Sequence, residues 1–148
     1  MAQTNEPLLS VKGLKQYFPV SKKFTVRAVD NISFDIYPGE TYGLVGESGS
    51  GKSTTGRSII RLYDPTEGTI LFNGEDISKK LTAKQEKMLR SDMQMVFQDP
   101  MASLNPHKKI LDTIAMGLDA HHPHMDQNER VERVSKMMEM VGLNPAYM

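Results

Sequence analysis

One short segment constrains the fold of this chain more than any other. Residues 46–53 read Gly-Glu-Ser-Gly-Ser-Gly-Lys-Ser. The five residues before them, Thr41–Val45, are mostly apolar and typical of a short buried strand. The residues after them, Ser53–Leu62, can form a helix with one apolar face. The order strand, glycine-rich loop, helix predicts an α/β fold in which the loop ends at a helix N-terminus.

The spacing of this loop fits the pattern G-x-x-x-x-G-K-[ST], a phosphate-binding loop or P-loop. Its glycines allow the main chain to approach an anion closely, and successive N–H groups can then point inward. Lys52 would reach the β- and γ-phosphates, and the Ser53 hydroxyl would bind Mg²⁺. The sequence therefore predicts a site for a nucleoside triphosphate. The predicted nucleotide-binding residues are Gly46, Glu47, Ser48, Gly49, Ser50, Gly51, Lys52, Ser53 and Thr54.

Composition narrows the class of protein. The 148 residues suffice for one compact domain, and the formal net charge of zero does not favour nucleic-acid binding. The chain has no cysteine, which excludes disulfides and thiolate metal sites and fits a reducing compartment. No apolar run approaches the roughly 20 residues of a membrane-spanning helix, and the N-terminus does not resemble a signal peptide.

The remaining chain contains several predicted elements. Leu8–Phe18, with mixed periodicity, and Phe24–Tyr37, whose apolar residues alternate, are predicted to form two antiparallel strands. They lead into the strand before the P-loop and so predict a mixed sheet. Further along, the patterns predict a strand over 69–72 with a hairpin turn at 73–74, a helix over 79–90, a strand over 93–97, and two helices after residue 109, the second starting near Asp126. His121, His122 and His124 invite a metal site, but an exposed, proline-interrupted loop is the favoured interpretation.

Four stretches together resemble one family, the ATP-binding cassette (ABC) ATPases. They are Leu14–Val20, Ala28–Phe34, Gly39–Thr54 and Val96–Pro106. The last stretch, in which Gln-Asp-Pro is followed by Ser-Leu-Asn-Pro, resembles the Q-loop of the subgroup that serves oligopeptide and dipeptide importers. The resemblance implies a P-loop NTPase core with an N-terminal antiparallel β-subdomain and the start of a helical subdomain. It places the nucleotide-binding core in residues 1–97 and the Q-loop with the first helices in 98–148.

The resemblance also assigns roles to residues outside the P-loop. Phe18 matches the aromatic residue that stacks on adenine, with Tyr17 as the alternative if the register differs by one residue. A simpler interpretation makes Phe18 a core residue at the end of a strand. Gln98 matches the glutamine that contacts Mg²⁺, so Lys52 and Gln98 are the predicted catalytic residues and Ser53 and Gln98 the predicted metal ligands. The implied cofactors are ATP and Mg²⁺.

Several parts of the family's pattern are absent from the sequence. We find no apolar strand ending in Asp and Glu, no Ser-Gly-Gly-Gln signature, and no later histidine for the γ-phosphate. The resemblance thus implies an incomplete cassette, part of a longer ATPase, that binds Mg-ATP weakly and barely hydrolyses it. The implied partners are a second ATPase subunit, in a heterodimer rather than a homodimer, and membrane permease subunits that contact the region after Gln98. The implied location is the cytoplasmic face of the membrane.

Two other functions remain open at this point. One is an ABC ATPase that acts in translation or DNA repair instead of transport, against which the residues after Gln98 argue. The other is a nucleotide-binding module without enzymatic activity. The sequence does not distinguish a dipeptide, an oligopeptide or nickel as the transported solute.

Overall fold

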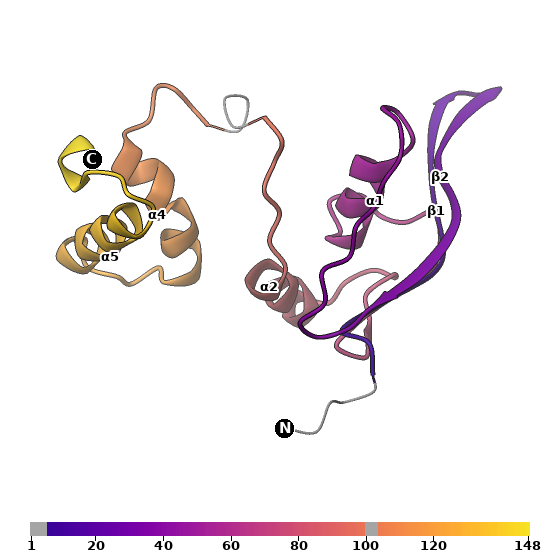
Figure 1. Ribbon diagram of the computed structural model, residues 1–148, viewed down its shortest axis with the longest axis horizontal. Coiled ribbons are helices and arrows are strands. Elements are labelled where there is room, and N and C mark those ends of the chain that lie inside the picture. Colours follow the sequence, from indigo (N-terminus) through magenta and orange to yellow (C-terminus); the bar gives the residue numbers. More distant parts are fainter. Residues whose placement is uncertain (1–5, 100–103) are drawn as a thin grey trace. The chain divides into compact units, whose positions relative to one another are not determined.

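A computed structural model describes residues 6–99 and 104–148 of the chain (Figure 1). Two compact units are present, an N-terminal unit of residues Met1–Met95 and a C-terminal unit of residues Val96–Met148. The N-terminal unit contains the strands and the P-loop, and the C-terminal unit is helical in its described residues.

The sheet of the N-terminal unit is antiparallel throughout, with the strand order β2-β1-β3-β4. Strands β1 (Leu9–Ser21) and β2 (Phe24–Ile36) form a long two-stranded ribbon, and β3 (Glu67–Phe72) pairs with the first half of β1. The predicted turn at 73–74 is confirmed, since Asn73 and Gly74 both have positive φ angles and connect β3 to the short β4 (Glu75–Asp76).

β1 continues past its predicted end at Phe18. Pro19 still pairs with Thr25 of β2, and the strand ends only at Ser21. The pairing of β1 with β3 stops at Lys15, so this part of β1 has a partner strand on one side only. Proline has no backbone N–H to donate. On the side of β1 that has no partner strand, this costs no hydrogen bond between strands.

Two helices complete the N-terminal unit. Helix α1 (Lys52–Ile59) follows the P-loop, and helix α2 (Ala83–Asp92) begins with a capping box between Thr82 and Gln85. Sheet and helices enclose one hydrophobic core, whose buried residues are Leu9, Val11, Leu14, Val29, Ile70, Phe72, Ile77 and Leu89.

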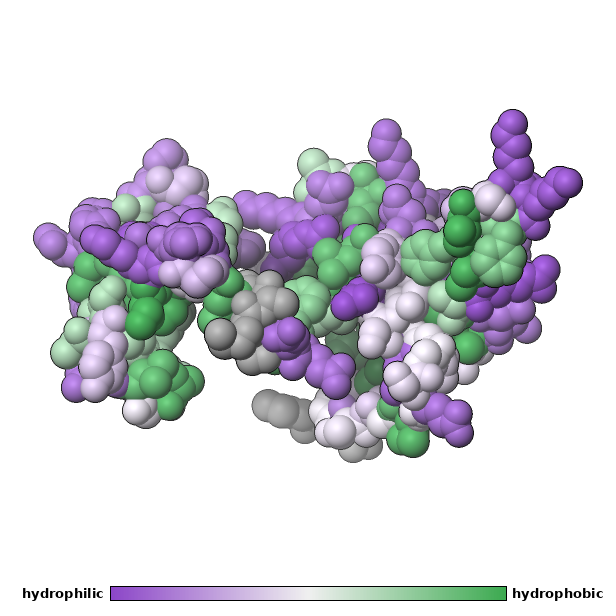
Figure 2. Space-filling model, turned by 90° about the horizontal axis from the view of Figure 1, so that it is seen from above, coloured by the Kyte–Doolittle hydropathy of each residue, from purple (hydrophilic) through white to green (hydrophobic). Residues whose placement is uncertain are grey.

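Two predicted strands are wrong for the described structure. Thr41–Val45 and Met93–Phe97 form no strand, and the sheet is antiparallel where a mixed sheet was expected. Val45 and Val96 are 94% and 97% exposed. An extended segment becomes a strand only when a neighbour accepts and donates its backbone hydrogen bonds, and no described strand pairs with either segment. Figure 2 shows apolar side chains exposed among hydrophilic ones on the face that it displays.

Among its described residues, the C-terminal unit contains helices α4 (Ile110–His121) and α5 (Gln127–Met140) and a short 3₁₀ helix, η1 (Pro145–Tyr147). The predicted start of α5 is confirmed, because the Asp126 carboxylate accepts hydrogen bonds from the N–H groups of Asn128 and Glu129. Ala115, Val134 and Met138 form the buried core between the helices. Within the described ranges, none of the helices is both long and apolar enough to cross a membrane.

Candidate functional site

The P-loop runs over residues 46–51 and passes directly into α1. Gly49 and Gly51 have φ angles of 82° and 91°, a region that favours glycine. At Gly51 a Cβ atom would lie 2.2 Å from the Ala28 carbonyl oxygen, so the loop backbone packs against β2 at a point where no side chain fits. Ala28 is an extra residue in β2, since the pairing with β1 passes from Val29 to Arg27. This bulge supports the end of the P-loop.

Lys52 lies folded back over the loop that precedes it. Its ammonium group donates hydrogen bonds to the Gly46 and Glu47 carbonyls, over 2.7 and 2.6 Å, and contacts the Ser50 hydroxyl at 3.3 Å. The positive charge is therefore held beside the loop backbone. Ser53, the second residue of α1, is exposed.

The N-terminus of α1 has no competing anion of its own. No side chain caps this helix, and its first turn contains no acidic residue. The first hydrogen bonds of the helix are accepted by the Gly51 carbonyl. Thr55 donates both of them, from its N–H at 2.8 Å and from its hydroxyl at 3.0 Å. The N–H groups of the first turn thus have no partner within the helix, and together with the helix dipole they favour a bound anion.

The two aromatic candidates lie on opposite faces of β1. The Tyr17 hydroxyl donates a hydrogen bond to the Asp30 carboxylate, which raises the pKa of Tyr17 above its ordinary value, and the Arg27 guanidinium lies 5.4 Å from the ring centre. Residues two apart share a face of a strand, so Phe18 lies on the face of Gln16. That face is directed toward α1, since Gln16 accepts a hydrogen bond from Ser58 at 3.2 Å.

Gln98 is exposed and belongs to the C-terminal unit. Its predicted role as a metal ligand together with Ser53 therefore stays a prediction. Residues 100–103, in the middle of the stretch that resembles a Q-loop, lie outside the described residues.

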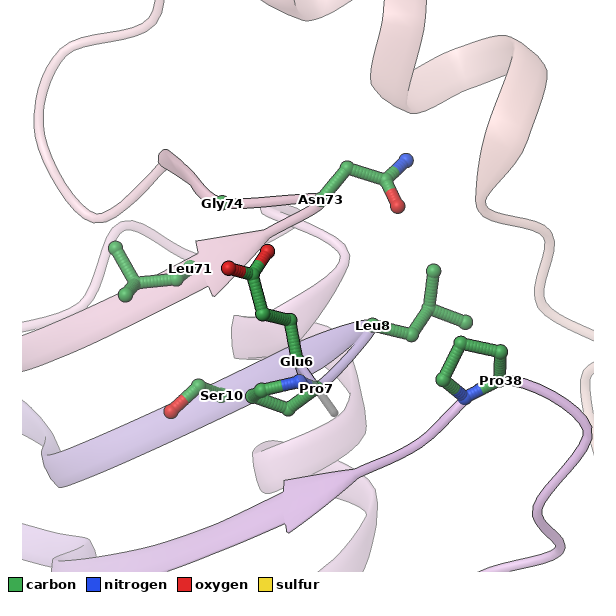
Figure 3. A pocket seen from close by; sticks show the side chains of 8 residues that line it. All are labelled: Glu6, Pro7, Leu8, Ser10, Pro38, Leu71, Asn73 and Gly74. Carbon is green, nitrogen blue, oxygen red and sulfur yellow. The ribbon is translucent and has the colours of Figure 1, made fainter. Parts of the chain in front are cut away.

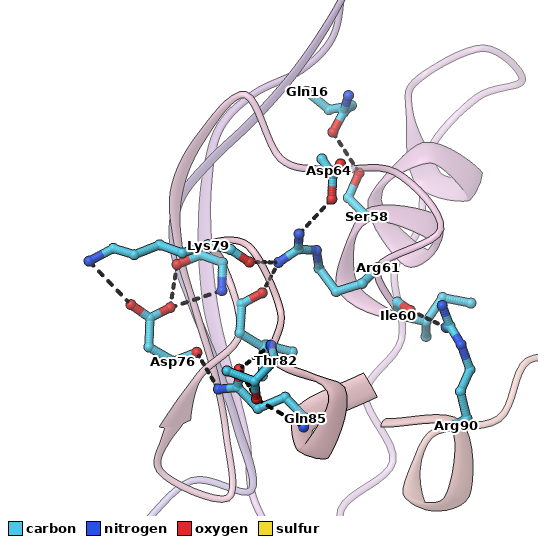
Figure 4. A network of polar contacts seen from close by, with 12 residues as sticks. Gln16, Ser58, Ile60, Arg61, Asp64, Asp76, Lys79, Thr82, Gln85 and Arg90 are labelled. Carbon is cyan, nitrogen blue, oxygen red and sulfur yellow. Dashed lines mark hydrogen bonds and ion pairs between the residues drawn. The ribbon is translucent and has the colours of Figure 1, made fainter. Parts of the chain in front are cut away.

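One feature near the site was not predicted from the sequence. Arg61 lies two residues beyond the end of α1 and is labelled in Figure 4. Its φ angle is 59°, and its side chain is only 3% exposed. The guanidinium donates to the backbone carbonyls of Ile77 and Lys79 and to the Asp64 carboxylate, the last over 2.6 Å. These contacts fix the end of the P-loop helix to the segment between β4 and α2. A buried arginine after a helix has no periodic signal, so sequence patterns do not reveal it.

Two pockets outside the P-loop offer less chemistry. A pocket of about 420 Å³ lies at the start of β1 and contains one ionisable group, Glu6 (Figure 3). Another, of about 330 Å³, is lined by His121, His122 and His124 with Glu129. Among the described residues, no group of three or more His, Asp or Glu side chains is arranged to hold a metal ion.

Comparisons with known proteins agree with the geometry of the loop. Residues 29–148 match the family model "ABC transporter". The oligopeptide transport ATP-binding protein OppF of Bacillus subtilis is 56% identical over 139 residues, which are 94% of this chain and 45% of that protein. The dipeptide transport ATP-binding protein DppF of Lactococcus lactis is 47% identical over 139 residues, 93% of this chain and 44% of its own length. The chain thus spans about half the length of these relatives.

Solved structures support the same assignment. The ATP-binding cassette MJ0796, solved as a dimer in a post-hydrolysis state with ADP and Pi, has a TM-score of 0.80 and 25% sequence identity, and the match covers 94% of this chain and 59% of that one. The cbiO1 protein of Clostridium perfringens has a TM-score of 0.68 at 25% identity, with 94% and 52% covered. These neighbours confirm the predicted cassette fold with its antiparallel β-subdomain. The chain belongs to the ABC transporter family, and it resembles the ATP-binding proteins of oligopeptide and dipeptide transport.

Proposed function

We propose that this chain binds Mg-ATP at the P-loop as the ATP-binding part of an importer for peptides. The observation that carries the proposal is the position of Lys52, whose ammonium lies on the carbonyls of Gly46 and Glu47 directly before an uncapped helix N-terminus. A cation and several unpaired N–H groups at one point are the elements that bind a phosphate chain.

We assign the adenine contact to Phe18 rather than to Tyr17. Phe18 shares the face of β1 that is directed toward α1, whereas the Tyr17 hydroxyl is engaged by Asp30 on the other face. An aromatic ring can stack on a base with little dependence on hydrogen bonding.

We assign Mg²⁺ to the Ser53 hydroxyl and to the Gln98 amide oxygen. Ser53 is exposed beside Lys52 at the start of α1, as a ligand shared with phosphate oxygens must be. The ion would neutralise charge on the β- and γ-phosphates, and these two oxygen donors suit a hard cation.

The chain spans about half the length of its relatives, and we extend the proposal to a protein of their full length. We propose that the nucleotide-binding core ends at residue 97 and that the region after Gln98 contacts membrane permease subunits. A second ATPase subunit, different from this one, would complete the ATP site at the cytoplasmic face of the membrane. Since the sequence has no Asp-Glu pair after an apolar strand and no Ser-Gly-Gly-Gln signature, we expect this chain alone to hydrolyse ATP negligibly.

Equilibrium binding of Mg-ATP, measured by calorimetry on the full chain, tests the proposal. Lys52→Ala removes the loop cation and should weaken binding about tenfold or more, as expected for lost hydrogen bonds to a charged group. Lys84→Ala, which removes an exposed lysine from α2, is the matched control and should leave the affinity unchanged. Equal affinities of the wild type and Lys52→Ala would refute a phosphate site at this loop.

A further inference from the structure

Phe18 makes a specific ring contact that the P-loop chemistry does not explain. Its ring centre lies 5.2 Å from that of Tyr63, with an angle of 83° between the ring planes. In such a T-shaped pair the edge of one ring meets the face of the other, a favoured arrangement of aromatic quadrupoles. At least one face of Phe18 is therefore not covered by Tyr63 and can accept another planar group.

The backbone holds Tyr63 firmly at this place. The N–H groups of Leu62 and Tyr63 both donate to the Arg57 carbonyl in the last turn of α1, at 2.9 and 3.3 Å. The residue before them, Arg61, has a positive φ angle and is fixed by its buried guanidinium contacts (Figure 4). On the other side, the Thr66 N–H donates to the Lys15 carbonyl at 2.9 Å. The segment that carries Tyr63 is thus tied at both ends, to α1 and to β1.

Phe18 itself has less support. It lies beyond Lys15, where β1 has lost β3 as a neighbour and pairs with β2 alone. The next apolar residues along the ribbon, Val20 and Phe24, are 65% and 59% exposed. A half-buried ring on such an edge has several rotamers available unless another group selects one. Among the described aromatic residues, Tyr63 is the one in ring contact with Phe18.

We infer that Tyr63 is a positioning residue for the nucleotide base, because its ring holds Phe18 in the orientation in which Phe18 stacks on adenine. The inference rests on the proposed ATP site and adds a residue to it. Tyr63 itself contacts Phe18, not the base. Its loss should weaken binding of ligands that carry a base and leave binding of a bare phosphate chain unchanged.

The experiment compares Mg-ATP with magnesium tripolyphosphate as ligands of the full chain. Tyr63→Leu removes the ring but keeps apolar volume, and it should weaken Mg-ATP about 3- to 10-fold, the range expected for one aromatic pair. Its affinity for tripolyphosphate should equal that of the wild type. Tyr63→Phe keeps the ring and should retain full affinity for both ligands. Tyr37→Leu, the same change at a half-exposed tyrosine after β2, is the control and should alter neither.

A double-mutant cycle shows whether Tyr63 affects Mg-ATP affinity through the position of Phe18 or only through the stability of the fold. If Tyr63 acts through Phe18, Tyr63→Leu should cause no further loss of Mg-ATP affinity in a Phe18→Leu background. Additive losses, an equal loss for ATP and tripolyphosphate, or unchanged ATP binding by Tyr63→Leu would each overturn the inference while the P-loop site stands. A wild-type chain that binds neither ligand would overturn the proposed function, and the inference with it.

Discussion

Gly51 offers the sharpest test of how the P-loop is held, because a methyl group at this position meets the backbone of β2. An alanine Cβ would lie 2.2 Å from the Ala28 carbonyl oxygen and 3.3 Å from its carbon, so the loop or the bulge has to move. Gly49 has a similar positive φ angle, 82° against 91°, but a Cβ there would meet nothing within 4 Å. Both positions favour glycine because of the positive φ angle, but only at Gly51 does a neighbouring backbone also exclude a side chain. Comparing the alanine variants at the two positions therefore measures the second effect alone.

The expected magnitudes follow from these two terms. A positive φ angle costs an L-residue roughly 1–2 kcal/mol, and this applies to both Gly49→Ala and Gly51→Ala. The clash at Gly51 adds about 1–3 kcal/mol, as overpacking does elsewhere. The lower entropy of an unfolded chain with alanine offsets part of the loss, but equally in both variants. Gly51→Ala should therefore lower the free energy of unfolding by at least about 1 kcal/mol more than Gly49→Ala.

Thermal unfolding followed by far-UV circular dichroism measures this difference, since the chain has no tryptophan to report by fluorescence. For a chain of this size, 1 kcal/mol corresponds to a shift in Tm of about 2–4 °C. Gly51→Ala should unfold at a temperature lower than Gly49→Ala by that amount or more. Equal Tm values for the two variants would show that the contact with Ala28 does not determine the choice of glycine.

Two further predictions concern ion pairs. Arg61→Leu should lower the free energy of unfolding by about 2–3 kcal/mol, because it leaves the buried Ile77 carbonyl and the partly buried Lys79 carbonyl without their donor. Asp64→Asn, at a carboxylate that is 91% exposed, should cost less than about 1 kcal/mol. Urea titration compares the two variants, and equal losses would refute the assignment. Hydrogen bonding to Arg130 lowers the pKa of Asp119 below its ordinary value of 3.8, so this pair stabilises the fold above that pH and its contribution is lost as the pH falls through the folded-state pKa. Asp119→Asn should therefore flatten the fall of Tm below about pH 4, and a Tm that falls equally steeply in the wild type and the variant over this range would contradict the prediction.

The sequence predicts those parts of the fold whose signals are local. The helix after the P-loop, the hairpin turn at Asn73 and the capped start of α5 at Asp126 each depend on a few neighbouring residues, and the structure contains all three. The strands expected over Thr41–Val45 and Met93–Phe97 depend on partners distant in the sequence. Apolar residues show that a segment can be buried in a sheet but not that a neighbouring strand is present.

The candidate site divides in the same way. The loop residues are predicted by the spacing of the P-loop pattern. The roles of Phe18 and Gln98 are predicted only by the resemblance to a family. The supports of the site were not predicted. The bulge at Ala28, the buried Arg61 and the ring of Tyr63 act through contacts across the fold, and none of them produces a periodic pattern.

Binding of the Mg-ATP phosphates by the loop amides can be followed residue by residue in a titration monitored by ¹H–¹⁵N correlation NMR. Each backbone N–H of residues 46–54 reports its own environment, as do those of α4 and α5. We expect Mg-ATP to shift the resonances of the loop and of the first turn of α1 most strongly, with a smaller change at Phe18. Shifts that spare residues 46–54, or that are largest in α4 and α5, would contradict the assignment of the nucleotide site.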